Sequence, residues 1–314
     1  MLAAIIGLKP RLRAAFLLAL SFAVPAAAQV PADAADVAAP LAIPDGAVGG
    51  MGDINLYPRR IVIDRRQRIA TVGLYNKTIN SGDYEIAIVD MVMSPSGGVH
   101  RLDNLPPGVP TERLKTASAM LRWSPRRVTL RGSEAQTVRI MARPPADLPD
   151  GEYRSHFMVV SVPPDVDQGL SIEDALAGTA TGGDSIGVSI RPRFGISIPV
   201  IVRIGETTLG VGLESPRLVD LAGGSKGIVV TVTRSGTRSA YGDIIVTAAG
   251  RAEPVALARG IGVYPEVDSR QVVLALDEGV DPAQLRPGTQ LTMTFVDDDF
   301  TPGETLARQE FVVP

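Results

Sequence analysis

Apolar and polar residues alternate along much of this chain, and the longest alternating run covers residues 186–202. Every even position in the run is apolar, whereas most odd positions are small or charged. Because the side chains of a strand have a period of two, this pattern predicts a strand with one apolar face. The run is much longer than a typical strand of about five or six residues. We therefore predict that part of it extends beyond its own core and offers apolar side chains to another molecule.

Shorter runs, separated by glycine- and proline-rich turns, predict further strands on both sides of this one. In the first half they lie at residues 61–63, 69–75, 84–93, 128–130, 137–142 and 153–162. In the second half they lie at residues 227–233, 243–248, 272–276, 290–296 and 308–313. With weak edge strands added, each half holds about seven strands, which favours an all-β protein of two tandem β-sandwiches.

The first 28 residues have the pattern of a cleaved signal peptide. Basic residues precede an apolar stretch at residues 14–24, and alanines at 26–28 form a small-residue cleavage site. The stretch is too short to span a bilayer, and no later segment approaches the roughly 20 apolar residues that a spanning helix needs. We expect a mature chain that begins at Gln29, enters the bacterial periplasm and starts with a flexible segment at residues 29–52.

Composition and short motifs narrow the chemistry. The chain has no cysteine and two histidines, which leaves few groups for thiolate, zinc or nucleophilic chemistry. Its net charge of -3 argues against nucleic acid as the main partner. Residues 223–227 match the G-x-S-x-G pattern of hydrolases, but an apolar β run follows where a helix is needed, which indicates a hairpin turn. The aspartates at 297–299 lack the spacing of a calcium loop and indicate a turn at a strand end. We predict no enzyme activity, cofactor or metal.

Four groups of segments in the first half then occur in a characteristic order. They are residues 57–63 with 72–76, 124–130 with 136–140, 148–156, and 198–203. Together they resemble the PapD-like periplasmic chaperones of pilus assembly, and residues 294–298 extend the resemblance into the second half. The resemblance implies two immunoglobulin-like sandwiches arranged as a boomerang, with a chaperone domain at 53–203 and a C-terminal domain at 204–314. The segment at 165–184 is similar to the long loop of some family members.

In that family the first domain lends an edge strand to a pilus subunit whose own sandwich lacks its final strand. Such a subunit exposes an apolar groove and unpaired sheet edges, and a donor strand covers both. The best donors in this chain are Ile186, Val188, Ile190 and Phe194. Four such side chains contribute about 6–12 kcal/mol when buried, against an association cost of roughly 4–15 kcal/mol. The alternative is that all even positions of the run face their own core.

The resemblance also places charged residues in the cleft between the domains. Arg60 aligns with the arginine that anchors the subunit's terminal carboxylate, which a guanidinium binds through two parallel hydrogen bonds. Its neighbour Arg59 is the alternative, because adjacent strand residues point to opposite faces. The second anchor of the family, a lysine, falls at Pro199 here, so Arg193 or Arg191 is the candidate substitute.

Glu152, Arg203 and Asp298 align with an ion network that sets the angle between the domains in this family. The function implied is that of a periplasmic chaperone that binds pilin-like fibre subunits and delivers them to an outer-membrane usher. A second copy of the chain, bound through the donor strand, is a further candidate partner. The main alternative is a structural or adhesive subunit of a surface fibre, but residues 29–50 lack the alternation of a donor extension. A hydrolase would need a carboxylate pair or triad, and none stands out.

Overall fold

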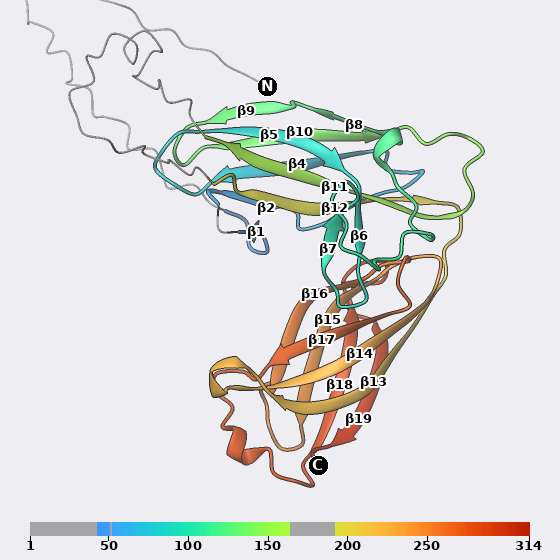
Figure 1. The fold of residues 1–314 in the computed structure, drawn as a ribbon. Helices are drawn as coiled ribbons and strands as arrows, with labels where there is room; N and C mark the ends of the chain where they lie inside the picture. Colours follow the sequence, from blue (N-terminus) through green and yellow to red (C-terminus); the bar gives the residue numbers. More distant parts are fainter. Residues whose placement is uncertain (1–42, 51, 164–191) are drawn as a thin grey trace, which may run out of the picture. The chain divides into compact units, whose positions relative to one another are not determined.

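The computed structural model describes residues 43–50, 52–163 and 192–314, and nearly all of its regular structure is β (Figure 1). The expected all-β fold class is confirmed. Strands β1–β12 form the first sandwich and strands β13–β19 form the second. The signal peptide, the loop at 165–184 and the proposed donors Ile186, Val188 and Ile190 lie outside the described residues.

The first sandwich contains two five-stranded sheets and a small hairpin (Figure 1). One sheet has the order β1-β2-β4-β10-β8 and the other has the order β3-β12-β11-β5-β9. The strands are β1 (Val48–Gly49), β2 (Ile54–Tyr57), β3 (Ile61–Ile63), β4 (Ile69–Asn76), β5 (Gly82–Val89), β6 (Met91–Met93), β7 (Val99–Arg101), β8 (Leu121–Ser124), β9 (Arg127–Leu130), β10 (Ala135–Ala142), β11 (Gly151–Val162) and β12 (Gly195–Ile204). Alternate residues of both sheets point inward, and Leu74 and Phe157 are each 0% exposed.

The second sandwich pairs a three-stranded sheet, β13-β14-β17, with a four-stranded sheet, β16-β15-β18-β19. Its strands are β13 (Leu209–Asp220), β14 (Lys226–Gly236), β15 (Ala240–Ala248), β16 (Ala256–Val263), β17 (Ser269–Ala275), β18 (Gln290–Asp297) and β19 (Thr305–Val312). Residues 221–225 connect two paired antiparallel strands, so the glycine-rich G-x-S-x-G match is a hairpin connection. Its core also holds Met93 from the β6–β7 hairpin of the first sandwich.

Two local features of the first sandwich position the candidate site. The chain leaves one sheet at the end of β2 and joins the other at β3, where it runs parallel to β12. The single strand expected at residues 84–93 is two strands, because β5 ends at Val89 and β6 begins at Met91.

Candidate functional site

Strand β12 lies second from the edge of its sheet, but only part of it is covered. On one side it pairs with β11 from Gly195 to Ile204. On the other side it pairs with β3 only through Val200, Ile201 and Val202. Within the described residues, no strand pairs with the Gly195–Pro199 part of this second side. A short unpaired sheet edge is therefore available there, with backbone groups that another strand could bond.

The apolar face of β12 leaves its own core at the start of the strand. Ile198, Val200 and Val202 are 1%, 0% and 1% exposed, respectively, and belong to the core of the first sandwich. Ile196 is half-buried against that core, whereas Phe194 is 39% exposed. The alternative that even positions face their own core therefore holds from Ile198 onward, and Phe194 marks where this core ends.

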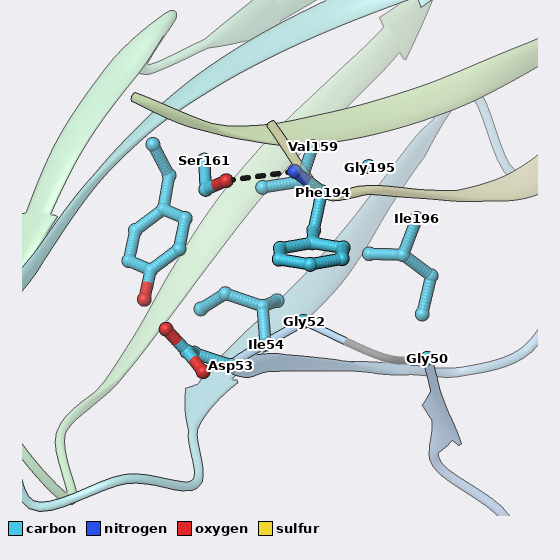
Figure 2. A pocket seen from close by; sticks show the side chains of 10 residues that line it. Gly50, Gly52, Asp53, Ile54, Val159, Ser161, Phe194, Gly195 and Ile196 are labelled. Atoms are coloured by element: carbon cyan, nitrogen blue, oxygen red, sulfur yellow. Dashed lines mark hydrogen bonds between the residues drawn. The ribbon is translucent and has the colours of Figure 1, made fainter. Parts of the chain in front are cut away.

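Phe194 lies on its own sandwich in a shallow recess (Figure 2). Its ring lies near Ile54, Ile196 and Gly52, and the recess holds a cavity of about 30 Å³. The backbone N–H of Phe194 donates to Oγ of Ser161 at 3.0 Å. A Cβ added at Gly52 would lie 2.9 Å from Cβ of Phe194, so glycine allows this close approach. The aromatic side chain thus packs against its own sandwich on one side and remains partly exposed to solvent.

A larger and more polar cavity of about 860 Å³ lies at the opposite end of β12. It is lined by Arg60, Val62, Asp64, Arg65, Arg66, Arg203, Gly205, Glu206, Thr207, Asp299 and Phe300. The guanidinium of Arg60 lies 3.9 Å from the ring centre of Tyr241, and its Nη2 donates to the carbonyl of Asp298 at 2.5 Å. The Nη1 atom of Arg60 is buried and has no hydrogen-bond partner among the described residues.

Arg203 and Glu152 form part of the expected ion network, but its second carboxylate belongs to Asp299. Nε of Arg203 donates to Glu152 at 3.2 Å, and both of its terminal nitrogens donate to Asp299. Burial disfavours the charge of Arg203, but its bonds and proximity to the two carboxylates outweigh this and raise its pKa. The carboxylate of Asp297 accepts the backbone N–H of Asp299 at 2.7 Å, in the turn expected at this strand end. That turn directs Asp299 inward and leaves Asp298 exposed, which corrects the prediction by one residue.

The structure does not bring Arg193 to the cavity that holds Arg60. Nη2 of Arg193 bonds Glu85 at 2.8 Å beside the start of β12, and both side chains are about half exposed. The four residue steps along the strand from Gly195 to Pro199 alone span about 13 Å. Because Ile61 pairs with Val200, position 199 lies at the level of Arg60. Pro199, at the position where the resemblance places the family's lysine, therefore lies beside Arg60.

A second buried ion pair, between Arg154 and Glu266, was not predicted from the sequence. Nη2 of Arg154 donates to Oε1 of Glu266, and each side chain is only 2% exposed. The same Oε1 accepts the backbone N–H of Met93 at 2.9 Å, and the guanidinium of Arg154 lies 3.6 Å from the ring centre of Tyr264. The pair joins β11 to the second sandwich. The only signal in the sequence for this ion pair was a charged residue, Arg154, inside an otherwise mostly apolar strand.

Comparisons with known proteins gave structural similarities alone. No family model matches the sequence, and no curated protein matches it. The YadV chaperone is 14% identical, with a TM-score of 0.41 over 83% of this chain and 100% of that chain. The E. coli chaperone DraB is 12% identical, with a TM-score of 0.40 over 83% and 96%. The Pseudomonas aeruginosa CupB2 chaperone is 13% identical, with a TM-score of 0.39 over 81% and 97%.

Proposed function

We propose that this protein is a non-enzymatic periplasmic chaperone that completes the unfinished sandwich of a fibre subunit with the edge of β12. The observation that carries the proposal is the uncovered edge at Gly195–Pro199 next to the exposed ring of Phe194. A client that lacks one strand needs backbone donors and acceptors along its open edge, and apolar side chains for its open groove. The start of β12 presents both at one place.

The division of the alternating run supports this use of the strand. Its later even positions, from Ile198 onward, stabilise the first sandwich itself. Its earlier even positions, Ile186, Val188, Ile190 and Phe194, are the side chains proposed to enter the client. Phe194 is 39% exposed in the described structure, so a client can bury this exposed part of the side chain without unfolding the first sandwich.

The cavity around Arg60 supports a second contact with the same client. A subunit strand that runs parallel to β12 would bring its terminal carboxylate to this cavity. The unpartnered Nη1 atom of Arg60 is a buried donor, which a carboxylate oxygen would satisfy. Arg65 and Arg66 line the same cavity and replace the distant Arg193 as candidates for the second positive charge. Glu152, Arg203 and Asp299 are proposed to hold the two sandwiches at a fixed angle.

No helix in the described part of the chain has the length and hydrophobicity to span a membrane. The proposed periplasmic location rests on the signal peptide pattern at residues 1–28. The proposed domain limits are 53–203 and 204–314. An outer-membrane usher is the proposed recipient of the client. A second copy of the chain is a proposed partner when no client is present, because it offers the same kind of edge.

Periplasmic co-expression with a pilin-like fibre subunit tests the function. The wild-type chain is expected to form a stable one-to-one complex that survives size-exclusion chromatography. Phe194→Asp and Ile190→Asp should abolish the complex because a charge in the client's groove is costly to desolvate. Val273→Asp is the matched control, since Val273 is 52% exposed on β17 of the second sandwich. The proposal fails if Phe194→Asp and Ile190→Asp capture the client as well as Val273→Asp does.

A further inference from the structure

The carboxylate of Asp299 lies between two arginines of the cavity around Arg60. Both terminal nitrogens of Arg203 donate to it, and its Oδ1 atom lies 3.4 Å from Nη2 of Arg60. The side chain of Asp299 is only 4% exposed and that of Arg60 is 12% exposed, so salt and water screen this contact weakly. A carboxylate of the chain itself therefore already lies at the guanidinium that is proposed to receive the client's carboxylate.

The buried charges of this group cancel one another. Arg203 also bonds Glu152 at 3.2 Å, so the guanidiniums of Arg60 and Arg203 are matched by the carboxylates of Glu152 and Asp299. The Nη1 atom of Arg60 has no hydrogen-bond partner among the described residues. A client carboxylate would consequently find a donor at Arg60, but no positive charge that lacks a counterion.

The remaining charges of the cavity leave this balance unchanged. Arg65 and Arg66 are opposed by Asp64 and Glu206, and all four residues are exposed. Salt screens exposed charges more strongly than the buried group around Arg60. The electrostatic attraction for a client carboxylate at Arg60 is therefore determined mainly by the nearest buried charges.

We propose that Asp299 weakens the binding of the client's terminal carboxylate to Arg60, which allows the client to be released to its recipient. The inference rests on the proposed function and assigns to one carboxylate the regulation of that site. A client oxygen bonded to Nη1 of Arg60 comes within about 8 Å of Asp299, because both carboxylates then contact one guanidinium. At an effective dielectric constant of roughly 20–40, repulsion between two negative charges at this separation lowers affinity about 5- to 30-fold.

Transfer of a bound subunit between chaperone molecules tests this inference. A complex of the tagged chain with a labelled pilin-like fibre subunit is mixed with excess untagged wild-type chain, and loss of label from the tagged chain gives the release rate. Asp299→Asn removes the competing charge but keeps an oxygen that accepts from Arg203. Release should therefore be about 5- to 30-fold slower than from the wild type, because affinity differences within one interface lie mostly in the dissociation rate. Asp298→Asn is the matched control, because Asp298 is exposed, and it should release the subunit at the wild-type rate.

The Arg60→Gln background separates charge competition from a change in packing between the sandwiches. In that background Asp299→Asn should no longer slow release, because the guanidinium that both carboxylates contact is absent. Asp299→Ser removes the same charge and takes the place of Asp299→Asn if that variant does not fold. Release from these Asp299 variants at the wild-type rate or faster, or equal slowing without Arg60, overturns the inference and leaves the proposed function intact. Absence of a complex with the wild-type chain overturns the proposed function itself.

Discussion

Glu266→Ala should destabilise the protein by about 3–5 kcal/mol, since it leaves the charge of Arg154 buried without its counterion. Both side chains are 2% exposed, so water cannot replace the lost partner without opening the structure. The substitution also removes the acceptor for the N–H of Met93, which is bonded at 2.9 Å. Nη2 of Arg154 keeps the carbonyl of Met91 at 3.1 Å, which favours the lower end of the range.

Urea unfolding followed by circular dichroism measures this loss as a shift in the free energy of unfolding. Glu310→Ala is the matched control, because the pair of Arg308 and Glu310 is 60% and 53% exposed. Its loss should cost no more than about 1 kcal/mol. The double variant Arg154→Met, Glu266→Leu removes both charges and should regain most of the stability lost by Glu266→Ala.

Equal losses for Glu266→Ala and Glu310→Ala would refute the reasoning, because burial would then make no difference to the energy of the pair. A double variant as unstable as Glu266→Ala would also contradict it. That result would place the cost in lost packing and not in an unpaired charge.

Three further predictions concern pH, the ion network and the link between the sandwiches. Burial, followed by the nearby charge of Arg154, lowers the pKa of His156 well below 6.5, so the unfolded chain binds its proton first. Stability should therefore fall below pH 6.5 by up to about 1.4 kcal/mol per pH unit, and urea midpoints between pH 7.5 and 5 should show a shallower slope in His156→Gln. Asp299→Asn should lower the thermal midpoint more than Asp298→Asn, because only the first weakens bonds to a buried arginine; equal midpoints would contradict this assignment. Gly205 has a φ of +60° and faces the Asp150 carboxylate, so Gly205→Ala should cost at least about 1 kcal/mol in urea unfolding, which an unchanged midpoint would disprove.

Regular alternation allowed the well-paired strands to be predicted from the sequence. The expected strand at residues 61–63 coincides with β3, and that at 290–296 lies within β18. In the second sandwich the strands β13 and β16 were missed, and both lie at the edges of their sheets. The register of β13 shifts between Glu214 and Arg217, and a bulge of this kind interrupts the period of two that the sequence must show.

The candidate site was predictable only as far as local sequence determines side-chain direction. Alternation alone indicated one apolar face for the run that includes β12, because successive strand residues always point to opposite sides. It could not show that this face leaves its own core between Ile198 and Phe194. That limit depends on which residues pack against each side chain of this face, and the core residues around β12 come from strands that are far apart in the sequence.

The charged residues of the site were likewise only partly predictable from the sequence. Glu152 and Arg203 were named from the family resemblance, but the partner carboxylate is that of Asp299 and not of Asp298, because the turn after β18 determines which one points inward. Alternation, turn residues and the absence of cysteine are local properties, so the sequence by itself determined an all-β chain without thiol chemistry. Which edge stays uncovered, and which buried charges meet across two sandwiches, depends on long-range packing that only the tertiary structure decides.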